Sequence, residues 1–394
     1  RIPCPLDPSH AVDRNRLESH LKVCPKLRDG SFLLLQPFFR KGANLRDGSC
    51  LEGGQPGNAL EGVKYAAAEV VEDWDWRISD AYPKAVREVL GPSVDPVVLF
   101  ELPVTGECHE QVSHSEKHEV QNAALAALAS GAGTARGALL VEYGCGRGGL
   151  MAAIRPQRTQ SRCVLVDRKN HRHKVENRRD NKEEQALLRL RLDIEDFDLS
   201  ALLQGACGPP PLAGAGFSNC QKTQERLEAQ RLLAASVSAP PWPPPELLVC
   251  AKHLCGSGMD VALQSLTAVL EHGGLETAVC IATCCHHRCD AASYVNMQFL
   301  QRLGLCGDAA SFGHFVSTAG WGVGGRDLSK RRVGVMSKRI LDLGRVAWLQ
   351  DTLRLESAQL AAFIGKEVTP ENVAIVAGRH CGSRTSDVSS AGAS

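Results

Sequence analysis

Short apolar runs recur along the middle and the end of the chain, and each has about the length of one buried strand. The first lies in ALLVEYGCGRGGL at 138–150, where it runs into Gly-x-Gly-x-Gly and then a helical pattern. This order predicts a strand, a tight turn and a helix. The other predicted strands lie in CVLVDR at 163–168, LRLRLDIEDFDL at 188–199, ELLVCAKHLCG at 246–256, LETAVCIATCCHHRC at 275–289 and ENVAIVAGRH at 371–380.

Helical patterns lie before and between these runs. Residues 61–90 read as helix, with Trp74, Trp76 and Tyr82 as packing anchors, and HEVQNAALAALAS at 118–130 is rich in strong helix formers. Strands that alternate with helices predict an open, mostly parallel α/β sheet with helices on both faces.

Composition along the chain divides it into regions. Residues 38–62 are Gly-rich without a period and predict a loop or linker, and the Pro/Gly/Ala-rich insert at 205–245 is predicted to be disordered around a short charged helix. We expect a small finger at 1–28, a linker and helical region at 29–117, the α/β domain at 118–380 and a disordered tail at 381–394.

The finger is predicted from CPLDPSHAVDRNRLESHLKVC, whose spacing is C-x5-H-x9-H-x3-C. Two thiolates and two imidazoles suit a tetrahedral structural zinc site, and a segment this short cannot bury a core without such a staple. His20 and Cys24 share one face of a predicted helix, and Cys4 and His10 in a Pro-containing loop would complete the tetrahedron. The alternative is a disulfide between Cys4 and Cys24.

Composition and charge narrow the class of protein. A chain of 394 residues with 43% hydrophobic residues is expected to be soluble, because it has no long apolar run and no signal pattern. Its 16 cysteines form no regular disulfide framework, which favours a reducing, intracellular compartment. The net charge of +1 gives no general argument for nucleic acid, so basic segments 168–179 and 326–339 are the candidate contacts.

The glycine turn predicts a ligand site. Gly144, Gly146 and Gly148 let the backbone turn sharply and approach a ligand at a helix N-terminus. Glu142 precedes the turn, and Asp167 ends the next strand, where a carboxylate can bind ribose hydroxyls. Both a dinucleotide and S-adenosylmethionine fit, because GCGRGG also matches G-x-G-x-x-G.

Two features add detail to this site. Asp193, in the third strand, together with the acidic residue of the first, favours S-adenosylmethionine. Lys252 and His253 follow the fourth strand, at the carboxyl edge where ligands bind in such sheets. A lysine there can take a proton if burial depresses its pKa, so Lys252 is the candidate activator and His253 the second candidate, against a surface lysine as the alternative.

The segment CIATCCHHRC at 280–289 packs four cysteines and two histidines into ten residues. A second zinc is one interpretation. Neighbours on a strand point to opposite faces, however, so Cys284, Cys285, His286 and His287 are instead expected to line the substrate cleft beside Lys252.

The segments VEYGCGRGGL, VLVDR, AKHLCG and CCHHRCD together resemble the eukaryotic tRNA 2′-O-methyltransferases that modify nucleotide 4 of the acceptor stem. The opening finger is similar to that family's CHHC zinc finger, and the match runs from Cys4 to about Ala377. Family members also carry a CCCH finger before the CHHC one, so we expect that this chain, which lacks an initiator Met, is missing its natural start.

The resemblance implies a Rossmann-like, class I S-adenosylmethionine-dependent methyltransferase that acts on a ribose 2′-hydroxyl in tRNA. It places Gly144, Gly146 and Gly148 at the methionine moiety, Asp167 at the ribose and Asp193 near the adenine. The basic segments would hold acceptor-stem phosphates. Two alternatives stay open: an NAD-dependent oxidoreductase and a non-catalytic zinc-finger RNA-binding protein.

Overall fold

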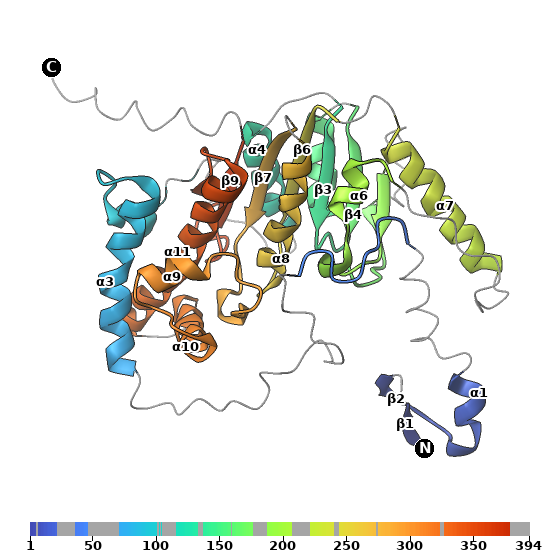
Figure 1. The fold of residues 1–394 in the computed structure, drawn as a ribbon, viewed down its shortest axis with the longest axis horizontal. Helices are drawn as coiled ribbons and strands as arrows, with labels where there is room; N and C mark the ends of the chain where they lie inside the picture. The colour runs from blue at the N-terminus through green and yellow to red at the C-terminus, as the bar shows by residue number, and fades with distance from the viewer. Residues whose placement is uncertain are drawn as a thin grey trace.

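The protein is described by a computed structural model, shown in Figure 1. The described residues are 1–4, 7–21, 36–45, 71–100, 102, 104, 116–132, 137–158, 160–175, 187–206, 221–239, 244–272, 275–323 and 327–378. Residues 46–62 of the linker predicted at 38–62, residues 207–220 and 240–243 of the insert predicted at 205–245, and the tail at 381–394 lie outside them.

A seven-stranded sheet forms the centre of the molecule, in the order β5-β4-β3-β6-β7-β9-β8. Strands β3 to β7 are parallel, and β9 runs antiparallel to both β7 and β8. The predicted open, mostly parallel α/β sheet is therefore confirmed. The strands are β3 (Leu139–Tyr143), β4 (Arg162–Val166), β5 (Leu187–Leu190), β6 (Glu246–Ala251), β7 (Glu276–Ala282), β8 (Gln359–Ala362) and β9 (Val373–Ala377).

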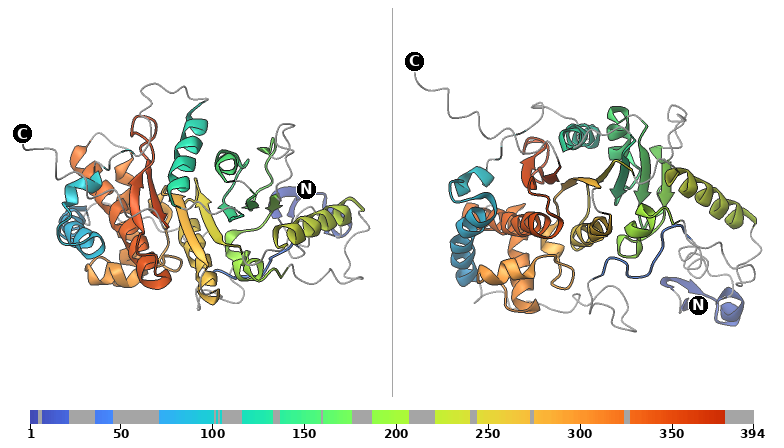
Figure 2. Two further views of the ribbon diagram at one scale, coloured as in Figure 1. Left: turned by 90° about the horizontal axis from the view of Figure 1, so that it is seen from above. Right: turned by 45° about the horizontal axis from the view of Figure 1, so that its top comes forward.

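Helices cover both faces of this sheet, as Figure 2 shows from above. On one face, α4 and α5 pack against Leu140 and its neighbours, and on the other a larger core forms around Leu139 and Val141. The helices are α3 (Val71–Leu90), α4 (Lys117–Ala132), α5 (Gly149–Ile154), α6 (Leu199–Leu203), α7 (Gln221–Val237), α8 (Gly258–Ser265), α9 (Met297–Arg302), α10 (Ala309–Ala319) and α11 (Leu328–Leu353).

The central strands are buried on both faces, so they read as continuous apolar runs rather than as alternating ones. All residues of β3, β6 and β9 are buried. Short 3-10 helices complete the chain: η2 (Pro96–Phe100), η3 (Arg155–Gln157), η6 (Ile194–Asp196), η7 (Leu266–Glu271), η8 (His286–Arg288) and η9 (Gly320–Gly322).

Two expectations about elements were wrong, and one strand was not predicted. The strand predicted over 188–199 ends at Leu190, because the Asp193 side chain accepts the Glu195 N–H and starts η6 instead. The edge strand β8 was not predicted, since its four residues QLAA give no alternation to detect. Trp76 on α3 is 69% exposed and is no packing anchor, whereas Trp74 is buried.

The first residues form a separate small motif. Strands β1 (Ile2–Cys4) and β2 (Asp7–Val12) pair as an antiparallel hairpin, followed by η1 (Arg14–Arg16) and α1 (Leu17–Leu21). The Pro-containing loop expected around Cys4 is thus a hairpin. Among the helices of the described chain, none has the length and apolar character needed to cross a bilayer.

Candidate active site at the carboxyl edge of the sheet

The glycine turn links β3 to α5. Gly144, Gly146 and Gly148 have φ values of 59°, 53° and 86°, which lie in the left-handed region where a side chain is strained. The Gly146 N–H donates to Asp167 Oδ2 at 2.8 Å, which ties the turn to the end of β4. The three glycines and Asp167 therefore meet at one edge of the sheet, as the sequence predicted.

Asp167 keeps capacity to accept further hydrogen bonds. Its Oδ1 accepts the Lys169 N–H at 2.7 Å, and His171 Nε2 lies 3.2 Å from Oδ2. A carboxylate offers about four lone-pair sites, so ribose hydroxyls could still be accepted. Asp193, after β5, caps η6 and lies 3.8 Å from Arg168 Nη1, which places it at the same edge as Asp167.

Glu142 lies beneath the turn rather than on its surface. Its side chain is buried and its Oε2 accepts the Met151 N–H at 3.0 Å, near the start of α5. Burial raises the pKa of Glu142 to about 8, which favours the neutral acid at neutral pH. Glu142 thus lies beneath the turn and holds the start of α5, and its predicted contact with a cofactor stays a prediction.

Arg189 on β5 is a site residue that sequence reasoning missed. Its Nη1 donates to the Gly146 carbonyl oxygen at 2.8 Å and to Cys145 Sγ at 2.9 Å. It therefore fixes the glycine turn from the neighbouring strand. The sequence does show a charged residue at this position of the predicted strand over 188–199. The strand pattern alone did not mark this residue as functional.

Lys252 follows β6 and reaches across to α4. Its Nζ donates to Asn122 Oδ1 at 2.7 Å and lies 3.4 Å from both the backbone oxygen and Nδ1 of His118. Burial lowers the pKa of Lys252, although the Glu142 carboxyl opposes this shift. Asn122 and His118 were not predicted as site residues; the signal was a polar pair within an Ala-rich helix.

The segment that carries Lys252 lies against the glycine turn. A Cβ built on Gly144 would meet Leu254 Cδ2 at 2.8 Å and the His253 carbonyl oxygen at 3.3 Å, so the two predicted halves of the site are in contact. The His253 and His118 rings meet edge to face, with their centroids 6.1 Å apart. Burial and the nearby Lys252 charge lower the pKa of His253 to about 4, so it is neutral at pH 7.

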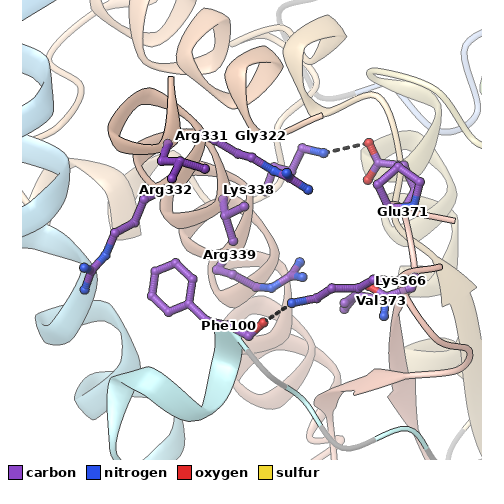
Figure 3. Close-up of a pocket in the computed structure, with 13 residues that line it drawn as sticks. Phe100, Gly322, Arg331, Arg332, Lys338, Arg339, Lys366, Glu371 and Val373 are labelled. Carbon is purple, nitrogen blue, oxygen red and sulfur yellow. Dashed lines mark hydrogen bonds and ion pairs between the residues drawn. The ribbon is translucent and has the colours of Figure 1, made fainter. Parts of the chain in front are cut away.

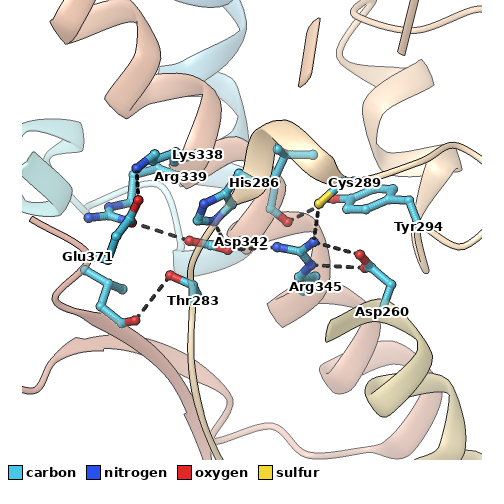
Figure 4. Close-up of polar contacts among 12 residues, drawn as sticks. Asp260, Thr283, His286, Cys289, Tyr294, Lys338, Arg339, Asp342, Arg345 and Glu371 are labelled. Atoms are coloured by element: carbon cyan, nitrogen blue, oxygen red, sulfur yellow. Dashed lines mark hydrogen bonds and ion pairs between the residues drawn. The ribbon is translucent and has the colours of Figure 1, made fainter. Parts of the chain in front are cut away.

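His286 does not line the substrate cleft, which corrects that expectation. It is fully buried, and its Nε2 lies 2.7 Å from Asp342 Oδ1 on α11 (Figure 4). The network continues to Arg345, which donates to Asp342, to both oxygens of Asp260 and to Cys289 Sγ. Buried charges need such partners. Through their contacts with Asp342 and Arg345, His286 and Cys289 join the segment after β7 to α11.

A basic cavity of about 360 Å³ lies further along the same edge (Figure 3). The backbone oxygen of Val373, one of the lining residues, accepts the N–H of Thr283, which directly follows β7. The cavity therefore lies at the carboxyl end of β7. The cations of its lining are Arg331, Arg332, Lys338, Arg339 and Lys366, and Glu371 is the one acidic side chain among the lining residues. The cavity therefore has an excess of positive charge. Part of the basic segment 326–339 forms it.

The second basic segment, 168–179, follows β4 and is described only to residue 175. Arg168 is 71% exposed in its side chain and lies near Asp193. This part of the segment is therefore at the same edge as the glycine turn.

The finger brings two of its four predicted ligands together. Cys4 Sγ lies 3.3 Å from His20 Nε2. His10 lies on β2, and Cys24 lies outside the described residues.

Comparison with known proteins identifies the family. The family model "Methyltransferase TRM13" matches residues 120–210, 226–331 and 326–378, which is more than half of the chain and includes the glycine turn, Lys252 and α11. The chain belongs to the TRM13 methyltransferase family. The model of the U11-48K-like CHHC zinc finger matches residues 1–25. The suspected family, the class I methyltransferase fold and the CHHC finger are confirmed, and the oxidoreductase alternative is rejected.

Curated members of the TRM13 family match almost the whole chain. The Saccharomyces cerevisiae protein named "tRNA:m(4)X modification enzyme TRM13" is 22% identical over 95% of this chain and 84% of its own length. The proteins of the same name from Schizosaccharomyces pombe and Vanderwaltozyma polyspora are 25% and 23% identical, each over 96% of this chain, and over 95% and 89% of their own lengths. Among solved structures, the plantazolicin methyltransferase BpumL in complex with SAH aligns at a TM-score of 0.29 and 9% identity, too low to support a conclusion.

Proposed function

We propose that this TRM13 family member transfers a methyl group from S-adenosylmethionine to the ribose 2′-hydroxyl of nucleotide 4 in the acceptor stem of tRNA. The observation that carries the proposal is that the TRM13 family model matches the residues at the carboxyl edge of the sheet. The names of the matching relatives state that they are tRNA modification enzymes. Lys252 lies in the segment whose His253 and Leu254 contact the glycine turn, and it is the proposed proton acceptor.

The glycine turn fits the proposed cofactor. Among the described residues, no atom lies within 4 Å of a Cβ built on Gly146, so the backbone there borders open space. The turn glycines would line the methionine moiety, Asp167 would accept from the ribose hydroxyls, and Asp193 would lie near the adenine. When bound, S-adenosylmethionine supplies an electrophilic methyl group on a sulfonium.

Lys252 is the proposed acceptor of the hydroxyl proton. A ribose hydroxyl is a poor nucleophile at neutral pH, so attack requires both orientation and a proton acceptor. Burial lowers the pKa of Lys252, which increases the fraction of neutral amine, and Asn122 holds Nζ in place. With a pKa of about 4, His253 is the weaker base and is proposed to support the loop through its contact with the turn.

The basic cavity is the proposed contact for the RNA backbone. An A-form helix is recognised mainly through phosphates and 2′-hydroxyls, which favours a cationic surface beside the reacting group. Arg331 and Lys366 are exposed at this cavity, which shares the carboxyl edge of the sheet with Lys252. Arg168 is a further candidate phosphate contact.

Zinc is the proposed ion of the finger, held by Cys4, His10, His20 and Cys24. Two thiolates and two imidazoles suit a closed, tetrahedral structural site. The 3.3 Å contact between Cys4 Sγ and His20 Nε2 supports the pairing of these two ligands. A site of this kind stabilises the fold of the finger and supplies no chemistry to the transfer.

Methyl transfer from labelled S-adenosylmethionine to unmodified tRNA transcripts tests the proposal. The control transcript carries a 2′-deoxy sugar at position 4 of the acceptor stem. Label on the first transcript alone supports both the reaction and the site of methylation. Label on both would place the methyl group elsewhere, and label on neither, with RNA binding retained, would favour the non-catalytic RNA-binding alternative.

A further inference from the structure

Three cysteines outside the finger meet at the same edge of the sheet. The sulfur atoms of Cys255, Cys284 and Cys285 all lie within 4.8 Å of one another. Cys255 Sγ and Cys284 Sγ are 3.7 Å apart. Cys255 is exposed and the other two are half-buried, so the cluster is open to solvent. We call it the cysteine trio.

Backbone geometry explains how neighbouring cysteines can turn to one point. Strand β7 ends at Ala282, and Cys285 has a φ of 44°, in the left-handed region that few side chains other than glycine adopt. The alternation of a strand therefore no longer applies to Cys284 and Cys285. The argument from strand geometry that spoke against a shared ion here was wrong for this pair.

A close backbone approach brings the third cysteine to this pair. Gly256 has a φ of 63°, and a Cβ built on it would lie 2.4 Å from the Arg288 carbonyl oxygen. Only glycine lets the segment after Lys252 pack this tightly against η8. Cys255, next to this glycine, is thereby held beside Cys284.

We propose that the cysteine trio is a second metal site that binds a zinc ion through three thiolates. With Zn–S bonds of about 2.3 Å, tetrahedral geometry places two sulfur ligands about 3.8 Å apart, close to the 3.7 Å between Cys255 and Cys284. Thiolate ligands select zinc over hard cations such as magnesium and calcium. Water occupies the fourth position. The ion joins the segment that carries Lys252 to the turn after β7.

Zinc content of the full chain, measured by elemental mass spectrometry after purification with added zinc and dialysis, tests the site. We expect two ions per chain in the wild type, one in the finger and one in the trio. Cys284→Ser should keep one ion, Cys4→Ser should keep one, and the double variant should keep none. Cys289→Ser is the matched control, because Cys289 lies in the same segment but contacts Arg345, and it should keep two.

A Cys284→Ser variant that keeps as many ions as the wild type would overturn the proposal, whatever the occupancy of the finger. A mass two hydrogens lower under non-reducing conditions, assigned to Cys255 and Cys284, would instead show a disulfide and also overturn it. Should the Cys284 variant fail to fold, alkylation of the exposed Cys255 in the wild type decides. We expect slow alkylation with zinc and at least tenfold faster alkylation after chelation; equal rates would reject the site. None of these results depends on methyl transfer.

Discussion

Lys252 Nζ donates a 2.7 Å hydrogen bond to Asn122 Oδ1, and this contact joins the end of β6 to α4 across 130 residues of sequence. The Asn122 amide is neutral, so it orients the Lys252 amine but adds no negative charge that would raise its pKa. This distinction decides how the pKa of Lys252 responds to substitution at Asn122.

Asn122→Asp should move the activity profile to higher pH. A carboxylate at this distance favours the charged lysine and raises its pKa, so less neutral amine is present at pH 7. We expect kcat at pH 7 to fall at least tenfold and to recover in part at pH 9. Ala127→Asp adds the same charge to an exposed position of α4 and should leave the profile unchanged. An unshifted profile for Asn122→Asp would show that Lys252 is not the base.

Gly144→Ala should weaken binding of S-adenosylmethionine at least tenfold. The substitution adds left-handed strain of about 1–2 kcal/mol and pushes a methyl group into Leu254, beside the segment that carries Lys252. Calorimetric titration of the cofactor measures the effect. Gly137→Ala is the control, because Gly137 has a φ of 75° but no atom of the described residues within 4 Å of the added Cβ. Equal cofactor binding by both variants would contradict the assignment of the turn.

Glu142→Gln should flatten the pH dependence of stability. The folded pKa of about 8 lies above the unfolded value, so the folded state retains a proton that the unfolded state loses. The contribution of this group to the free energy of unfolding therefore decreases by about 1.4 kcal/mol per pH unit between the two pKa values. Gln keeps the acceptor for Met151 and does not titrate. Chemical denaturation of both proteins from pH 5 to pH 8 measures the difference, and parallel curves would refute the buried neutral acid.

Asp342→Asn should destabilise the protein by about 3–5 kcal/mol, because it leaves the buried Arg345 charge less compensated. Burial alone would raise the pKa of Asp342, but His286, Arg345 and Arg339 lower it to about 2. The ionised carboxylate therefore stabilises the folded state above the ordinary carboxyl pKa. This contribution is lost as the pH falls toward 2. Asp80→Asn removes an exposed ion pair with Lys84 and should change the free energy of unfolding by less than about 1 kcal/mol. Urea denaturation compares the two, and similar small effects would show that the buried network is not stabilising.

Arg331→Gln combined with Lys366→Gln should weaken tRNA binding and reduce its dependence on salt. Each lost phosphate contact lowers the slope of log K against log salt by about 0.7–0.9, so the double variant should lose about 1.5. Lys84→Gln with Arg87→Gln removes the same charge from exposed positions of α3 that do not line the cavity. Filter binding over a range of salt concentrations measures both slopes. Equal slopes in the two double variants would mean that the cavity does not contact RNA.

Much of the sheet could be predicted from the sequence, because its central strands are buried on both faces and stand out as apolar runs ending in glycine or polar residues. β3, β4, β6, β7 and β9 were recognised in this way. The strand at 188–199 was drawn too long, since apolar alternation continues past Leu190 while the Asp193 side chain turns the backbone. Periodicity reports burial and does not register such a local hydrogen bond.

The sequence by itself determined the α/β class, the glycine turn with Asp167 and the position of Lys252 after its strand, because all of these follow from local pattern and from the rule that ligands bind at the carboxyl edge. Only the tertiary structure decided that Asn122 holds Lys252, that Glu142 is buried beneath the turn, that His286 faces Asp342, and that three cysteines meet. These relationships join segments distant in sequence, or depend on one left-handed residue at Cys285, and neither is encoded in the period of the chain.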